Sequence, residues 1–129
     1  MALRTLIVDD NAHFLDTARD LLERGEVSVV GVASTISEAL RRAGELRPDV
    51  ILVDIDLGEE SGFDLARELS ESMGEDRPHV ILISAYPEED LADLIEASPA
   101  VGFLPKSRVS ATAILELVAS ADGDNTDVV

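Results

Sequence analysis

One apolar run that stops at a carboxylate constrains the fold of this chain more than any other feature. Val50 to Val53 are four consecutive apolar residues, and Asp54 follows them directly. A short apolar run without polar alternation is typical of a strand covered by helices on both faces, as in a parallel sheet. Asp54 would then lie where the strand leaves the sheet, which is the edge where open α/β folds bind ligands. We therefore interpret Asp54 as a phosphate-accepting nucleophile.

Short apolar runs alternate with amphipathic segments along the rest of the chain. Four further strands are expected at residues 4–8, 27–32, 80–83 and 101–104. Five helices are expected after the strands, because apolar residues recur there at three- and four-residue spacing. The expected helix starts are Asn11, Thr35 or Ser37, Ser61, Pro87 and Ser110. This alternation predicts an α/β fold with a five-stranded parallel sheet in order 2-1-3-4-5 and helices on both faces.

The chain length and composition favour one folded, cytoplasmic domain. The sequence has 129 residues, of which 46% are hydrophobic, and we expect the domain to occupy residues 1–121. Residues 122–129 are expected to form an acidic tail or the start of a linker. No signal-peptide pattern and no apolar run of membrane-spanning length is present, so no membrane contact is expected. The absence of cysteine excludes disulfides and thiolate metal sites.

The charge of the chain narrows the classes of partner. A net charge of -17 repels phosphate backbones, which argues against direct nucleic-acid binding, whereas an acidic chain suits a divalent cation. The basic residues are nine arginines and a single lysine, Lys106. Only Pro105 separates Lys106 from the end of the fifth predicted strand, so Lys106 is expected at the same edge of the sheet as Asp54.

Two more carboxylates belong to this edge. Asp9 and Asp10 follow the first predicted strand, which neighbours the third strand in the expected order. Carboxylates at such a short separation repel one another, and they stay ionised only if a positive charge lies among them. Mg²⁺ accepts carboxylate, water and phosphate oxygens, so Asp9, Asp10 and Asp54 are candidate ligands for Mg²⁺ or Mn²⁺. The alternative for Asp9 and Asp10 is helix capping.

The fourth and fifth predicted strands each end near a polar group. Ser84 follows the fourth strand and has a local turn as its alternative role, and Lys106 could also be an ordinary surface lysine. With Asp54 and the acidic pair they make up a nucleophile, a metal site, a hydroxyl and an ammonium group. Phosphoryl transfer uses such a set for in-line attack, charge neutralisation and positioning.

Four motifs in order make the chain resemble the receiver domain of two-component response regulators. The motifs are LIVDDN, VILVDIDL followed by Gly62, VILISAY and GFLPKS, and the resemblance extends from about residue 4 to residue 121. It implies a flavodoxin-like, chemotaxis-regulator-like fold in which Asp54 accepts a phosphoryl group from a sensor histidine kinase. The other implied roles are Mg²⁺ ligands for Asp9, Asp10 and the backbone carbonyl of Asp56, and phosphoryl contacts for Ser84 and Lys106.

The resemblance also implies how a phosphorylated state would be read and how long it would last. Phe103 matches the aromatic switch position that responds to Ser84, although an ordinary core role is the alternative. Asp56 and Tyr86 lie two residues past Asp54 and Ser84 and flank the path of the attacking water, so they are expected to tune the lifetime. A downstream protein or an output domain outside this sequence would recognise the phosphorylated state. A phosphorylation-dependent homodimer is a further expectation.

The sequence departs from the family pattern at two turns and leaves two alternatives open. Gly58 stands where many members have proline, which predicts a looser loop, and Ser107 rather than proline follows Lys106. One alternative is a degenerate receiver that binds partners without phosphorylation. The other is a haloacid dehalogenase-like phosphatase, whose first motif resembles Asp54-Ile55-Asp56. In that family, however, the acidic pair comes last in the chain.

Overall fold

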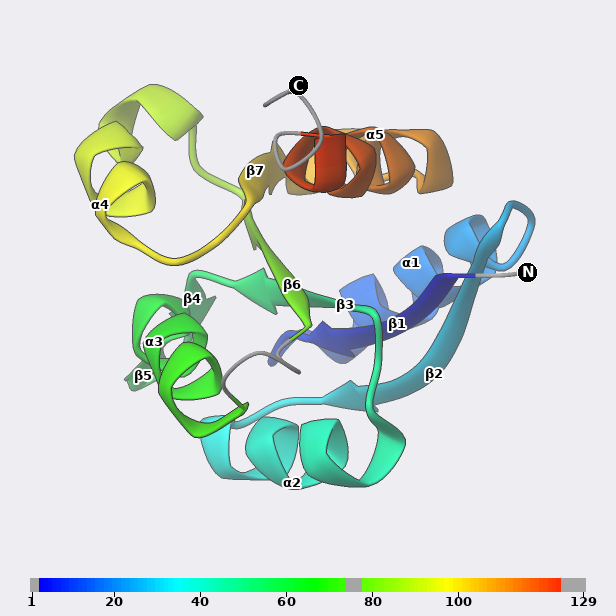
Figure 1. The fold of residues 1–129 in the computed structure, drawn as a ribbon, viewed down its shortest axis with the longest axis horizontal. Helices are drawn as coiled ribbons and strands as arrows, with labels where there is room; N and C mark the ends of the chain where they lie inside the picture. The colour runs from blue at the N-terminus through cyan, green and yellow to red at the C-terminus, as the bar shows by residue number, and fades with distance from the viewer. Residues whose placement is uncertain (1–2, 74–77, 124–129) are drawn as a thin grey trace.

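The main sheet has five parallel strands in the order β2-β1-β3-β6-β7 (Figure 1). The computed structural model describes residues 3–73 and 78–123. The strands of this sheet are β1 (Leu3–Val8), β2 (Val27–Ala33), β3 (Val50–Asp54), β6 (His79–Ser84) and β7 (Gly102–Pro105). Numbered within this sheet alone, the order is 2-1-3-4-5, so the predicted topology is confirmed.

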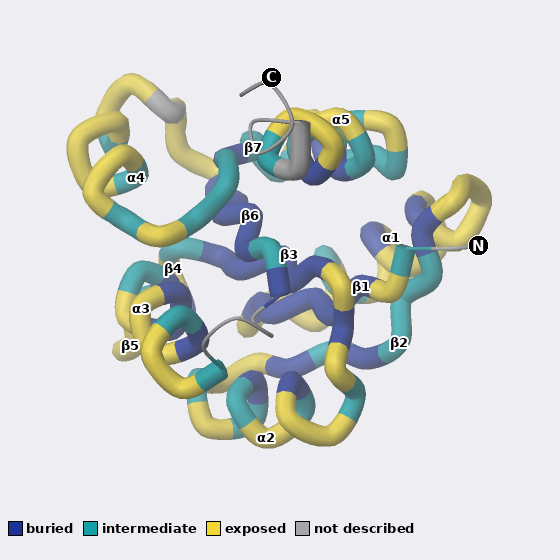
Figure 2. The backbone as a smooth tube through the Cα atoms, viewed as in Figure 1, coloured by how far each residue is buried: buried dark blue, intermediate teal, exposed yellow. Residues whose placement is uncertain are grey.

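Helices cover both faces of the sheet. They are α1 (Ala12–Leu22), α2 (Ile36–Leu46), α3 (Gly62–Met73), α4 (Ala92–Ala97) and α5 (Ala111–Gly123). Ile51 and Val53 pack in the core cluster that α2 and α3 complete, whereas Val50 and Leu52 pack in the cluster that α1 and α5 complete. Both faces of β3 are therefore buried, as the dark strands at the centre of Figure 2 show. This two-sided burial is why the run before Asp54 contains no polar residue.

Three of the predicted helix starts are capped by the expected side chains. The side-chain oxygen of Asn11 accepts a hydrogen bond from the Phe14 N–H at 3.2 Å. Thr35 caps α2 and Ser110 caps α5 in the same way, at 3.2 and 3.1 Å. Each cap satisfies a backbone donor that has no partner within its own helix. The caps thereby fix the direction in which each helix leaves the sheet edge.

The segment before β7 differs from the predicted fourth helix. The prediction began this helix at Pro87, but the chain forms a 3₁₀ turn, η2 (Glu88–Asp90), before the six-residue α4. The N-cap position of α4 lacks a side-chain hydrogen bond. Ile95 of α4 packs against the core, whereas Leu94 is 55% exposed.

One apolar side chain of α1 is also exposed. Helical spacing in the sequence puts Leu21 on the same apolar face as Ala18 and Leu22, but Leu21 is 49% exposed, while Leu22 is fully buried. Adjacent helical residues point about 100° apart, so only one of the two can share the buried stripe that contains Ala18. Ala18 and Leu22 are four residues apart and occupy that stripe together.

A small hairpin replaces the loop predicted after Asp54. Strands β4 (Asp56–Leu57) and β5 (Glu60–Ser61) pair antiparallel and are joined through Gly58, whose φ of 73° is easily adopted only by glycine. The expected looseness of this loop stays a prediction. The hairpin is also tied to α2, because a Glu60 side-chain oxygen accepts a hydrogen bond from the Ile36 N–H at 3.0 Å.

Two predicted segments fall partly outside the described residues. Residues 75–78, for which the charged sequence ending in proline indicates a loop, are described only at Pro78, and the predicted tail from residue 122 is described only to Gly123, the end of α5. The division into a domain and a tail therefore stays a prediction. In the part of the chain that the structure describes, no helix has the length and apolar character needed to cross a bilayer.

Candidate functional site

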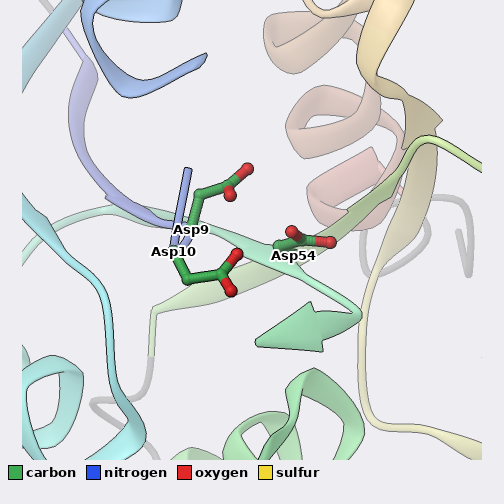
Figure 3. Close-up of side chains that lie close together, drawn as sticks. All are labelled: Asp9, Asp10 and Asp54. Carbon is green, nitrogen blue, oxygen red and sulfur yellow. The ribbon is translucent and has the colours of Figure 1, made fainter. Parts of the chain in front are cut away.

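Three carboxylates meet at the carboxyl ends of β1 and β3. Val8 pairs with Val53 in the parallel register, so Asp9 and Asp54, one residue further on, lie beside each other. Figure 3 shows the side chains of Asp9 and Asp10 next to that of Asp54. One carboxylate oxygen from each of the three lies within 4.8 Å of the others. The sheet edge therefore gathers three oxygen ligands in a space that one small cation can fill.

Backbone donors hold the two buried carboxylates in place. Asp9 is fully buried and Asp54 is 4% exposed, whereas Asp10 is exposed. The Asn11 N–H donates to Oδ1 of Asp9 at 2.9 Å, and the Asp56 N–H donates to Oδ1 of Asp54 at 3.1 Å. Each acid is thus anchored through one oxygen by the residue two positions later.

Lys106 bridges the other two oxygens. Its Nζ lies 2.7 Å from Oδ2 of Asp9 and 3.0 Å from Oδ2 of Asp54, and its side chain is 19% exposed. Within the described residues, Oδ2 of Asp9 is buried and has no aligned hydrogen bond besides this ion pair. One ammonium group cannot neutralise three carboxylates, and burial makes an uncompensated charge on Asp9 or Asp54 costly.

The charges of the site shift the pKa values of its groups. Burial raises the pKa of Asp54 from 3.8 to about 6 and the charge of Asp9 adds to the rise, while the Asp56 N–H and Lys106 oppose it. Burial favours the neutral form of Lys106, but its contacts with Asp9 and Asp54 outweigh burial and raise the pKa of Lys106 above 10.5. At neutral pH Asp54 is therefore ionised but poorly compensated, which suits a nucleophile.

The oxygen donors and the charge fit a divalent cation. Oδ2 of Asp9 is buried with the Lys106 ammonium at 2.7 Å as its partner, and Asp10 adds a carboxylate oxygen on the solvent side. Hard cations such as Mg²⁺ take oxygen ligands of this kind together with water. The site opens into a cleft of about 190 Å³. Its lining residues are Asp10, Asn11, Asp54, Asp56, Ser84, Ala85, Tyr86 and Lys106.

The remaining predicted residues lie on β6 and β7 and the turns that follow. Ser84 ends β6, is 1% exposed, and its Oγ accepts a hydrogen bond from the Tyr86 N–H at 2.9 Å. Tyr86 is 60% exposed beside the cleft. Phe103 does not line the cleft: it is 8% exposed and belongs to the same core cluster as α2 and α3. The predicted switch residue is thus in an inward position.

One contact in the site was missed by the sequence interpretation. The ring of Phe14 lies 4.8 Å from Nζ of Lys106, a contact that the apolar spacing of the first helix does not reveal. The available signal was its position in the first turn of α1, four residues after Asp10, which directs the ring back toward the sheet edge. Asn11 was expected as a cap, and it also lines the cleft.

The fold and the site together define a class of open α/β domain with a group of carboxylates at the carboxyl edge of its parallel sheet. Residues 5–119 match the family described as the response regulator receiver domain. The chain therefore belongs to the receiver domain family, the signalling domains of two-component systems.

Curated proteins with similar sequences are longer than this chain. Sensory transduction protein LytT of Bacillus cereus is 33% identical over 87 residues, which cover 67% of this chain and 35% of LytT. A protein-glutamate methylesterase/protein-glutamine glutaminase of Thermotoga maritima is 33% identical over 120 residues, which cover 91% of this chain and 34% of that protein. The chain thus spans about a third of the length of these relatives.

Solved structures share the fold over nearly the whole chain. The signal receiver domain of a modulated diguanylate cyclase from Desulfovibrio desulfuricans G20 is 28% identical, with a TM-score of 0.78 and 98% coverage of both chains. The signal receiver domain of the NarL response regulator from Mycobacterium tuberculosis is 29% identical, with a TM-score of 0.76 and coverage of 93% of this chain and 95% of that one.

Proposed function

We propose that Asp54 is the residue that accepts the phosphoryl group, and that the donor is a phosphohistidine of a sensor kinase. The observation that carries this proposal is the setting of the Asp54 carboxylate. It lies at the end of β3, reaches the cleft, and is oriented by the Asp56 N–H and by Lys106. Asp9 is fully buried and Asp10 stands at the rim, so Asp54 is the acid that combines orientation with access.

The transfer step needs attack in line with the bond that breaks. A carboxylate oxygen of Asp54 forms a bond to phosphorus while the phosphorus–nitrogen bond of the donor breaks, and the donor imidazole leaves with that electron pair. Lys106 then contacts an oxygen of the transferred group, and the Ser84 hydroxyl donates to another. The backbone N–H of Asp56 keeps the attacking carboxylate in position throughout.

Asp9, Asp10, Asp54 and the backbone carbonyl of Asp56 would hold Mg²⁺, or Mn²⁺, in this proposal. When bound, the cation supplies positive charge that neutralises the attacking carboxylate and the phosphoryl oxygens. The support is the group of three carboxylate oxygens within 4.8 Å and the buried Oδ2 of Asp9. Lys106 neutralises one negative charge of the same acids, and the cation would neutralise the remaining negative charge.

The phosphorylated state would be read through β6 and β7. The added charge attracts Lys106 and the Ser84 hydroxyl. A move of Ser84 favours the inward packing of Phe103, and this shifts the equilibrium between two packings of β6 and β7. The reader would be a downstream protein or an output domain outside this sequence, and phosphorylation would also favour a homodimer. We place the signalling domain at residues 1–121, in the cytoplasm.

Asp56 and Tyr86 would set the lifetime of the phosphorylated state. Both line the cleft, and both are exposed to the water that would hydrolyse the acyl phosphate. Slow hydrolysis at Asp54 would reset the domain, so the chain acts once per phosphoryl group rather than as a turnover enzyme.

Acetyl phosphate and Mg²⁺ test the proposal without the kinase. The intact wild-type chain should gain one group of about 80 Da, and Asp54→Asn should gain none. A wild-type chain that stays unmodified but still binds partners would support the degenerate receiver instead. Continuous release of phosphate from generic phosphomonoesters would support a phosphatase.

A further inference from the structure

The ammonium group of Lys106 has a third neighbour besides its two acids. The ring of Phe14 lies 4.8 Å from Nζ, within the distance at which the face of an aromatic ring attracts a cation. Asp9 and Asp54 contact the same nitrogen at 2.7 and 3.0 Å. The cation is therefore held between an aromatic ring and two carboxylates.

A closed circuit of contacts fixes the ring relative to the acids. The Asn11 N–H donates to Oδ1 of Asp9, and Oδ1 of Asn11 accepts from the Phe14 N–H. The Phe14 ring contacts the Lys106 ammonium, and the ammonium forms an ion pair with Oδ2 of Asp9, which closes the circuit. The cap of α1 thus determines both where the buried acid points and where the ring stands.

The Lys106 side chain must be confined if its ammonium group is to stay beside the two acids. Its four-carbon side chain is flexible, and its charge is strongly hydrated, so it gains from reaching into water. Lys106 starts the three-residue 3₁₀ turn η3 (Lys106–Arg108) and lines the cleft, which is open to solvent. Phe14 is half-buried on α1 and packs at the margin of the core cluster of α1 and α5, so its ring has little freedom to move away.

We propose that Phe14 is a positioning residue for phosphorylation of Asp54: its ring confines the Lys106 ammonium beside Asp9 and Asp54, where the incoming phosphoryl oxygens arrive. This inference rests on the proposed function. Phe14 touches neither the donor nor the reacting atoms and acts through Lys106. An aliphatic side chain of similar size fills the same space but lacks the negative ring face, so it leaves the lysine free to turn toward solvent.

The first test compares rates of labelling by acetyl phosphate in excess Mg²⁺. Phe14→Leu should be labelled about fivefold more slowly than wild type, and Phe14→Met should behave alike, while Phe14→Tyr should stay within about twofold of wild type. Phe63→Leu is the matched control, because Phe63 is also half-buried but lines a separate cleft between α3 and α4. Thermal unfolding of each variant establishes that it is folded.

The second test observes the lysine itself. Because the sequence contains one lysine, selective ¹³C labelling of lysine gives a single ε-CH₂ signal. The Phe14 ring current should displace this signal in wild type and Phe14→Tyr, and the displacement should disappear in Phe14→Leu but persist in Phe63→Leu. This readout does not depend on phosphorylation.

The outcomes separate the two proposals. Slower labelling together with loss of the ring-current shift, both specific to the aliphatic variants at position 14, supports the positioning role. Equal labelling rates in Phe14→Leu and wild type, an unmoved lysine signal, or equal slowing in Phe63→Leu overturns it while leaving phosphorylation of Asp54 intact. A wild-type chain that takes up no phosphoryl group overturns the proposed function and this inference together.

Discussion

Replacing Asp54 by asparagine should change how the stability of the metal-free protein depends on pH. Burial raises the pKa of Asp54 from 3.8 to about 6 in the folded chain. Between these two pH values the folded state holds a proton that the unfolded state has released. The stability contributed by the protonated Asp54 is therefore lost as pH rises from about 4 to about 6, and asparagine, which does not titrate, loses nothing.

The size of the effect follows from the two pKa values. Each tenfold difference in proton affinity corresponds to about 1.36 kcal/mol, so a shift from 3.8 to about 6 corresponds to about 3 kcal/mol. Above pH 6 the Asp54→Asn protein should be more stable than wild type by this order of magnitude. Near pH 4 the two should be about equal, because Asp54 is then neutral in the folded state.

Urea unfolding in EDTA, measured from pH 4 to pH 8, tests this prediction. The difference in unfolding free energy between Asp54→Asn and wild type cancels the titration of groups that do not interact with Asp54. It should rise by about 3 kcal/mol and level off above pH 6, and excess Mg²⁺ should narrow it by binding to wild type. A difference that does not vary with pH, or that falls as pH rises, would refute the reasoning.

Three further predictions concern the surroundings of the acid. Gly62→Ala should lower the unfolding free energy by about 2–4 kcal/mol in urea titrations, because an added Cβ would overlap the Asp54 carbonyl; a loss below about 1 kcal/mol contradicts this close contact. Lys106→Met should cost about 3 kcal/mol in EDTA by leaving buried carboxylates unpaired, and Mg²⁺ should restore most of it in thermal unfolding; equal losses with and without Mg²⁺ count against a shared charge site. Glu60→Ala should destabilise the chain by about 1 kcal/mol in the same assay, because it removes the acceptor of the Ile36 N–H, and an unchanged midpoint excludes a structural role for this bond.

The topology and the acidic cluster could be predicted because both follow from patterns local to the chain. The apolar run before Asp54 is buried on both faces of β3, and this fixes the strand type. Once strands one and three are neighbours, Asp9 and Asp54 must lie at the same edge. No feature of the packing of particular side chains was needed for these conclusions.

The features that were missed depend on tertiary packing. The contact between Phe14 and Lys106 joins residues 14 and 106 through a turn, η3, that the sequence did not predict. The hairpin after β3 arises because Gly58 adopts positive φ, which a glycine permits but does not demand. The shortened α4 and the exposed Leu94 reflect competition between weak helix signals and a single core contact through Ile95.

Locating the phosphorylated residue tests the central claim most directly. Borohydride reduces an acyl phosphate to an alcohol, so an aspartate that carried the phosphoryl group is recovered as homoserine and can be placed by peptide sequencing. After treatment of the wild-type chain with acetyl phosphate and Mg²⁺, the account predicts homoserine at position 54 alone. Homoserine at position 9, 10 or 56, or none in a folded chain supplied with the cation, would contradict it.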